Sequence, residues 1–432
     1  MAHDVSSDLT SDLTTDLTRV QRRTLTILFA TQVLGGVGVA IGLSVGALLT
    51  ADMAGIALSG LAQSAAVVGA ALLAVPATRI VRRRGRRPSL AATYAVAALG
   101  SAVVIWAAVT GSVPLLFAGF FLFGGGSTAG YQARYAAVDL APDASRGRHL
   151  SLIVWATTLG AVTGPNLAPL AGTLLEPRGI PALAGPFAFS AALMAAAAVV
   201  LMLFLRPDPA VVARETLPTR ASDDPAADAR VGLGAAFRAI MARPSARLGI
   251  AAAAVGHLVM VGVMSMTPVH IRGAGHDAAL TLRIVGVVLS LHIAGMFAFA
   301  PVTGWLTDRY GRQPVILGAV VILLAACAVA GTAGHGTPQL AIGLTLLGLG
   351  WSGTMVAGST LLSESVPADL RPSAQGLADL IMGLAGASAG ALAGPVVQLG
   401  GYPTLTLLAA ATTVPLAALA LRASAPPHAT GA

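Results

Sequence analysis

Three titratable side chains lie inside long apolar stretches of the sequence and have the chemistry to carry a proton. Asp379 is the only acid placed clearly within such a stretch, while His257 and His292 fall near the middle of two others. Ionisable groups are costly in apolar surroundings and are functional candidates by default. A histidine titrates near neutrality, and burial can tune a carboxyl group towards it. We expect Asp379 to carry a coupled proton, with the two histidines as competitors. A satisfied hydrogen bond between helices is the alternative role for each of the three.

Four further side chains in the apolar stretches are candidates for lining a cavity. Their amide and indole groups can hydrogen-bond a small molecule, and a hydrogen bond between helices is again the alternative. The four residues are Gln32, Gln63, Asn166 and Trp351.

Two patterns of enzymatic chemistry are absent from the sequence. The sequence has neither the zinc-binding pattern H-E-x-x-H nor the phosphate-binding loop G-x4-G-K-[ST]. The single cysteine, Cys327, lies in an apolar run, so a disulfide is impossible and metal ligation is not expected. We therefore predict no enzyme and no cofactor. An ion gradient, in the first place protons, is the expected energy source.

Charged residues concentrate in short loops between the apolar stretches. The loop over residues 304–314 holds one acid, Asp308, and two arginines, Arg309 and Arg312. The next apolar run follows at once, so the turn must be tight, and Gly311 permits the positive φ that such a turn needs.

These loops repeat about half a chain apart. Gly85-Arg86 aligns with Gly311-Arg312 at an offset of 226 (311 − 85). A second set of residues aligns at an offset of 225 (364 − 139): Asp139, Pro142 and Arg146 match Glu364, Pro367 and Arg371. The chain therefore reads as two related halves.

The overall composition defines the elements that must position these residues. Of the 432 residues, 56% are hydrophobic and only 10% are charged, and the mean hydropathy is +0.80. A soluble domain carries about 25% charged residues, so the sequence predicts a polytopic membrane protein. The net charge of +8 does not indicate nucleic-acid binding, because most arginines fall in short loops, where they set the topology.

A transmembrane helix needs about 20 apolar residues, and runs and breakers predict twelve spans. The arginine-rich connections fall on one side when both termini are cytoplasmic. The predicted spans are 25–49, 55–77, 89–110, 113–137, 150–174, 184–205, 247–269, 281–305, 314–333, 338–362, 373–398 and 402–422.

The fold class predicted from this pattern is all-α and membrane-spanning, with twelve helices in two six-helix repeats. The chain divides into a disordered cytoplasmic tail (1–23), an N-terminal half (24–205), a cytoplasmic central loop (206–246), a C-terminal half (247–422) and a second cytoplasmic tail (423–432).

The loop over 304–314 closely resembles the signature loop of the major facilitator superfamily, G-x-L-x-D-R-x-G-R-[KR]. Gln313 replaces the final basic residue. The resemblance implies two six-helix halves with a substrate site between them, and a conformational gate made by the loops. The matching residues are Gly304, Leu306, Asp308, Arg309, Gly311 and Arg312.

The first copy of the loop departs from this pattern, because Arg82 stands where the second copy has Asp308. The resemblance implies that the acid of this loop binds the start of a helix in the opposite half. A helix N-terminus repels cations, so Arg82 cannot take over this role. We expect it to meet Asp369 instead. The alternative is an arginine cluster that only sets orientation and contacts lipid headgroups.

The end of span four is similar to the family pattern R-x4-D-x2-P-x3-R-G-R, with Arg134 and Asp139 at the cytoplasmic end. Such residues suit a charge network that breaks and reforms, or else a static anchor. The full set of residues predicted for the gate is Gly304, Asp308, Arg309, Gly311, Arg312, Arg82, Arg86, Arg134, Asp139, Glu364 and Arg371.

Span five looks like the family's antiporter motif, G-x3-G-P-x2-G-G. Gly160, Gly164 and Pro165 match, whereas Ala168 and Pro169 replace the last two glycines. Ordinary close helix packing is the alternative role for such small residues. The motif favours export over import.

The sequence thus predicts an inner-membrane secondary transporter that exports a small, fairly apolar compound or drug in exchange for protons. We expect a monomer that contacts membrane lipid and a small-molecule substrate. The alternatives are a proton symporter that imports a nutrient and a membrane sensor or scaffold that does not transport. The connections predicted here are too short to hold a signalling domain.

Overall fold

The computed structural model describes residues 2–142, 145–216, 234–367 and 370–423, and no strand occurs among them. Its elements are α1 (Ala2–Ala54), α2 (Ile56–Ser59), α3 (Leu61–Arg84), α4 (Arg86–Thr110), α5 (Val113–Phe123), α6 (Gly125–Ala136), α7 (Arg146–Leu175), η2 (Glu176–Arg178), α8 (Gly185–Phe204), α9 (Pro209–Thr216), α11 (Pro244–Arg272), α12 (Ala278–Phe297), α13 (Ala300–Tyr310), α14 (Arg312–Gly331), α15 (Thr337–Ser365) and α16 (Arg371–Ala423).

Within the described residues, 11 helical stretches are long and apolar enough to cross a membrane. The hydrocarbon of a membrane offers backbone groups no hydrogen-bond partners, and a helix pairs these groups within itself. The last stretch, Ser373–Arg422, has 50 residues and leaves helical geometry at Gly401, where φ is 76°. It therefore holds two of the predicted spans, and the all-α membrane architecture is confirmed.

The chain forms two compact units. Unit 1 comprises Met1–Leu43 with Ala65–Arg220, and unit 2 comprises Ser44–Ser64 with Ala221–Ala432. The predicted halves divide the chain only at the central loop, whereas the second unit also contains the end of α1, α2 and the start of α3. α2 packs on α16, and the hydroxyl of Ser64, at the start of α3, donates to the Ala387 carbonyl of α16 at 2.6 Å.

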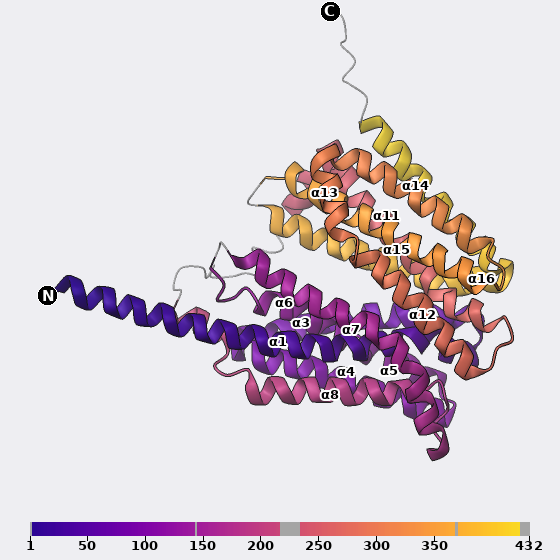
Figure 1. The fold of residues 1–432 in the computed structure, drawn as a ribbon, viewed down its shortest axis with the longest axis horizontal. Coiled ribbons are helices and arrows are strands. Elements are labelled where there is room, and N and C mark those ends of the chain that lie inside the picture. The colour runs from indigo at the N-terminus through magenta and orange to yellow at the C-terminus, as the bar shows by residue number, and fades with distance from the viewer. Residues whose placement is uncertain (1, 143–144, 217–233, 368–369, 424–432) are drawn as a thin grey trace, which may run out of the picture. The chain divides into compact units, whose positions relative to one another are not determined.

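The core of unit 1 gathers around α4, which packs against α8 and α5 (Figure 1). Phe187 of α8 meets the rings of Phe120 and Phe123 edge-on, with centroids 5.6 and 5.9 Å away. All three side chains are buried. Edge-to-face contacts of this kind add to the stabilisation that burial supplies.

In unit 2, α15 packs against α11, α12 and α14, and α11 also packs along α16 (Figure 1). The buried side chains of Leu248, Ile316, Val320 and Leu416 form one apolar cluster. This packing holds α11, α15 and α16 together, and these helices carry His257, Trp351 and Asp379.

Helices also occur outside the predicted spans, and one of them is α9 in the central loop. α1 begins at Ala2, where we expected a disordered tail over 1–23. We expected disorder because Asp8, Asp12 and Asp16 repel one another at a spacing of four residues. Each such pair opposes a helix by only about 0.2–0.5 kcal/mol, whereas an existing helix gains a hydrogen bond with each added residue. In the central loop, residues 234–241 form a short helix. Its Ile240 is buried in unit 2, whereas Phe237 and Met241 are exposed.

Candidate functional site

The two predicted loops have the same backbone geometry. Gly85 lies between α3 and α4 with φ 96° and ψ −177°, and Gly311 lies between α13 and α14 with φ 91° and ψ 162°. A side chain rarely tolerates this left-handed region. Glycine is therefore needed at both turns, each of which starts a membrane-spanning helix with an arginine.

In unit 1 this arginine binds an acid at the end of span four. Arg86 Nε and Nη2 donate to the two carboxylate oxygens of Asp139 at 2.8 and 3.0 Å. The two side chains are only 16% and 17% exposed. A paired fork of this kind is among the strong charge-assisted hydrogen bonds.

Unit 2 contains the same pair. Arg312 Nε and Nη2 donate to the Glu364 carboxylate at 2.9 and 2.6 Å. Arg312 also donates to the Thr307 carbonyl at 3.1 Å and lies 3.7 Å from Asp308. The repeat seen in the sequence thus places equivalent arginine–carboxylate pairs in both units.

The other predicted gate residues are more open. Asp308 is 78% exposed, Arg371 is also exposed, and no atom lies within 4 Å of a side chain built at Gly304. Arg309 lies over two exposed aromatic rings, those of Trp305 and Tyr310.

Two further arginines, Arg82 and Arg134, were predicted to belong to the gate. Asp369, the expected partner of Arg82, lies outside the described residues. Arg134 lies over the ring of Tyr131 at 5.4 Å, and its buried Nε has no hydrogen-bond partner among the described residues. Asp139 binds Arg86, an arginine of the loop between α3 and α4.

The proton-carrier candidates all lie in unit 2, in different surroundings. Asp379 is exposed on α16. The Trp351 indole donates to Nδ1 of His257 at 3.1 Å, so the proton of this imidazole is on Nε2. Nδ1 of the fully buried His292 meets the Leu344 carbonyl at 2.7 Å. A carbonyl only accepts, so Nδ1 of this ring bears the proton and Nε2 has no hydrogen-bond partner.

The cavity candidates divide into structural and open positions. Gln32 is buried, accepts a hydrogen bond from Tyr94 at 2.9 Å and donates one to Thr157 at 2.9 Å, so it joins α1, α4 and α7. Asn166 is exposed and donates to the Val162 carbonyl of its own helix. Gln63 and Trp351 are half-buried.

The span-five motif packs α7 against α1. A side-chain carbon at Gly160 would lie 2.7 Å from the Val37 nitrogen, and one at Gly164 would lie 2.8 Å from the Val37 carbonyl oxygen. The adjacent Pro165 is buried. These residues therefore bring two backbones into contact within unit 1.

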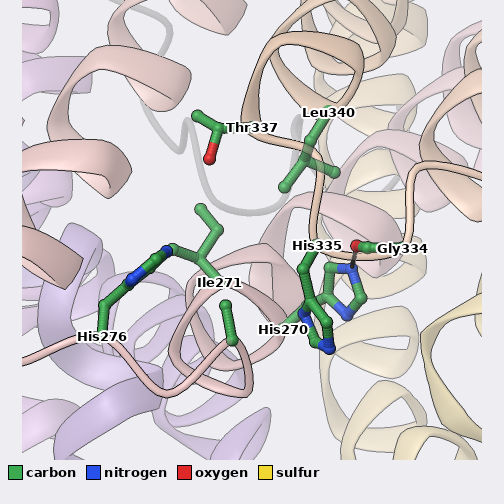
Figure 2. A pocket seen from close by; sticks show the side chains of 8 residues that line it. His270, Ile271, His276, Gly334, His335, Thr337 and Leu340 are labelled. Carbon is green, nitrogen blue, oxygen red and sulfur yellow. Dashed lines mark hydrogen bonds between the residues drawn. The ribbon is translucent and has the colours of Figure 1, made fainter.

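A separate pocket lies where the end of α11 meets the loop before α15 (Figure 2). Nε2 of His270 bonds the Gly334 carbonyl at 2.6 Å, and the His270 ring stacks on Tyr402 and His335. Among the described residues, no group of three or more histidine, cysteine, aspartate or glutamate side chains could hold a metal ion.

Sequence patterns missed two further contacts. The carboxylate of Asp208, which follows span six, accepts hydrogen bonds from two backbone N–H groups at the start of α4. Phe297 meets the Trp351 ring edge-on at 5.9 Å. The Pro-Asp-Pro pattern at 207–209 predicts a helix cap, but it does not say which second helix the acid reaches.

Apolar helices, an internal repeat and matched charged loops define a polytopic membrane protein of two related units. The family model of the Major Facilitator Superfamily matches residues 27–284 and 274–432. The chain belongs to this family, so the expected resemblance is confirmed, and it is a multi-pass membrane transporter.

Relatives and solved structures agree with this assignment. The chain is 38% identical over 389 residues to the uncharacterized MFS-type transporter YdeG of Bacillus subtilis, covering 90% of this chain and 88% of the relative. It is 28% identical over 412 residues to the riboflavin transporter RfnT of Brucella anthropi, covering 93% and 94%. The crystal structure of the nucleoside transporter NupG aligns with a TM-score of 0.71 at 17% identity, over 94% of this chain and 100% of that one.

Proposed function

We propose that the protein is a secondary transporter of the plasma membrane that exports a small, planar and fairly apolar compound in exchange for protons, by alternating access. Asp379 is the proposed proton carrier, and its exposed position on α16 is the observation that carries the proposal. A transported proton must be loaded from one side and released to the other, so its carrier needs access to water.

The neighbours of Asp379 on α16 support this role. Gly376 and Gly383 lie one turn before and one turn after it, and no atom lies within 4 Å of a side chain built at either glycine. Residues at these spacings share one face of a helix. The exposed carboxylate therefore lies between two glycines with open space around them, which supports access by a substrate and water.

The histidines are weaker carriers on the basis of their partners. A second proton on His257 would have to go onto Nδ1, which already accepts the Trp351 hydrogen bond. His292 has an open Nε2, but its ring is fully buried between α12 and α15. Proton transfer at either ring needs a rearrangement of these contacts, whereas Asp379 is exposed.

Aromatic side chains support a planar substrate. His257 and Phe297 approach the half-buried Trp351 with centroids 6.3 and 5.9 Å away. His257 in turn packs against Gly386, which follows Gly383 on the same face of α16. Aromatic rings favour stacked or edge-on contacts with a planar ligand.

Import of a nutrient is the second candidate, and the name of one relative suggests what the nutrient would resemble. The relative RfnT is named as a transporter of riboflavin, whose ring system is planar and heteroaromatic. A proton symporter for such a nutrient would use the same carboxylate and the same rings. The span-five motif of Gly160, Gly164 and Pro165 favours export instead, although the contacts of both glycines with α1 also fit plain packing.

Membrane vesicles of defined orientation distinguish the two directions. Export predicts that ethidium accumulates in inside-out vesicles with an acidic lumen and that the lumen becomes more alkaline as it enters. Import predicts that riboflavin accumulates in right-side-out vesicles in acidic medium. Transport of both probes that ignores an imposed pH gradient would overturn proton coupling, and Asp379→Asn is the control variant.

A further inference from the structure

The linker after span six begins with a capped helix. Asp208 precedes Pro209, the first residue of α9, and its Oδ1 accepts the Ala210 backbone N–H at 2.9 Å. Aspartate at the cap and proline at the first helical position are both favoured, because they satisfy or remove unpaired N–H groups. This part of the linker therefore has a defined start.

The same carboxylate caps a second helix. The N–H of Arg86 donates to Asp208 Oδ1 at 3.0 Å, and the N–H of Arg87 donates to Oδ2 at 2.8 Å. The Gly85 N–H donates to the Val81 carbonyl, and Pro88 has no N–H. Every backbone donor at the start of α4 therefore has an acceptor, and one side chain supplies two of them.

The turn leaves room for Asp208 only because the turn residue, Gly85, has no side chain. A carbon added to Gly85 would lie 2.3 Å from Asp208 Oδ2. At the equivalent Gly311, the nearest atom would be Pro314 Cδ at 3.8 Å. Both glycines share the left-handed backbone, but the acid occupies only the unit 1 turn.

A second contact of α9 fixes the other side of the loop. Arg214 Nη1 donates to the Arg82 carbonyl near the end of α3 at 2.8 Å. A cation is favoured at a helix C-terminus and an anion at a helix N-terminus. The cation Arg214 thus lies at the C-terminal end of α3, and the anion Asp208 lies at the N-terminal start of α4.

From these contacts we infer that Asp208 is a positioning residue for the unit 1 loop. Its carboxylate fixes the backbone of Arg86, whose guanidinium binds Asp139. We call the contacts of Asp208 and Arg214 with the two ends of the loop the clip. The linker thereby supplies an acid to the loop that has an arginine at position 82. The effect on turnover rests on the proposed transport function, whereas the clip itself does not.

Hydrogen exchange tests the clip without any substrate. In the purified full chain, Asp208→Ala should speed exchange of the Arg86 and Arg87 amides about tenfold or more, because a charge-assisted acceptor is lost. Asp208→Asn keeps one acceptor oxygen and should give a smaller change. Glu215→Gln removes an exposed acid from the same helix and should leave these amides unchanged. Equal exchange in Asp208→Ala and Glu215→Gln would overturn the clip.

The two glycines provide a matched pair for the same test. Gly85→Ala and Gly311→Ala carry the same backbone strain, but only the former displaces Asp208. Gly85→Ala should therefore destabilise the protein more. In an Asp208→Ala background its effect should fall to that of Gly311→Ala. An unchanged effect in that background would show that Gly85 serves only the turn.

A transport readout separates positioning from general stability. The initial rate of proton-driven ethidium transport should fall in Asp208→Ala, and this loss should not add to the loss in Asp139→Asn, because both act through Arg86. Additive losses would contradict the positioning role even if the exchange result holds. If ethidium and riboflavin are not transported at all, the proposed function fails while the exchange and glycine tests still decide the clip.

Discussion

The two arginine–carboxylate pairs should differ in strength, because they are buried to different extents. Asp139→Asn leaves the Arg86 guanidinium, only 16% exposed, without its acid. Breaking a buried pair in this way costs about 3–5 kcal/mol. Because some water still reaches both side chains, we expect about 2–3 kcal/mol here. In unit 2, Arg312 is 26% and Glu364 is 50% exposed. Exposed pairs contribute about 0.2–1 kcal/mol, so Glu364→Gln should cost less than about 1 kcal/mol.

Each variant is the natural control for the other, since both remove one charge from equivalent positions of the repeat. Unfolding in mixed micelles with a rising fraction of denaturing detergent, followed by tryptophan fluorescence, measures the difference in free energy. We expect Asp139→Asn to unfold at the lower detergent fraction by a clear margin. Equal losses in the two variants, or a larger loss in Glu364→Gln, would refute the reasoning from burial.

Three further changes test the gate, the packing and the proton carrier. Asp308→Asn should lose most transport while folding normally, because this acid is 78% exposed; wild-type transport rates would reduce the loop to a topology signal. Gly160→Val should cost about 1–3 kcal/mol through overpacking against α1, whereas Gly318→Val, with open space around it, should be tolerated; equal melting temperatures would contradict this contact. His257→Gln and His292→Gln should both keep pH-driven transport, and loss of the pH response in either would move the proton assignment to that histidine.

Local patterns predicted much of the fold and part of the site. Hydropathy located the spans because hydrocarbon allows few alternatives to a helix. The offset between Gly85 and Gly311 predicted two turns of the same geometry. The second offset aligned Asp139 with Glu364, each of which binds the arginine after its turn.

Contacts between distant parts of the chain were not predictable in the same way. Asp208 is 122 residues from Arg86 in sequence, and a cap motif specifies only its own helix. Gln32 has the polarity of a cavity residue, but its amide is taken up by Tyr94 and Thr157. Side-chain type alone cannot distinguish a group that binds substrate from one that joins helices.

Transport by Asp379→Asn in proteoliposomes tests the proton assignment most directly. The amide keeps the shape of the carboxyl group but cannot release a proton. The variant should still exchange labelled for unlabelled probe, whether ethidium or riboflavin, at a rate close to that of the native protein. It should lose the ability to concentrate the probe when a pH gradient is imposed. Accumulation of the probe against its gradient by Asp379→Asn would contradict the assignment.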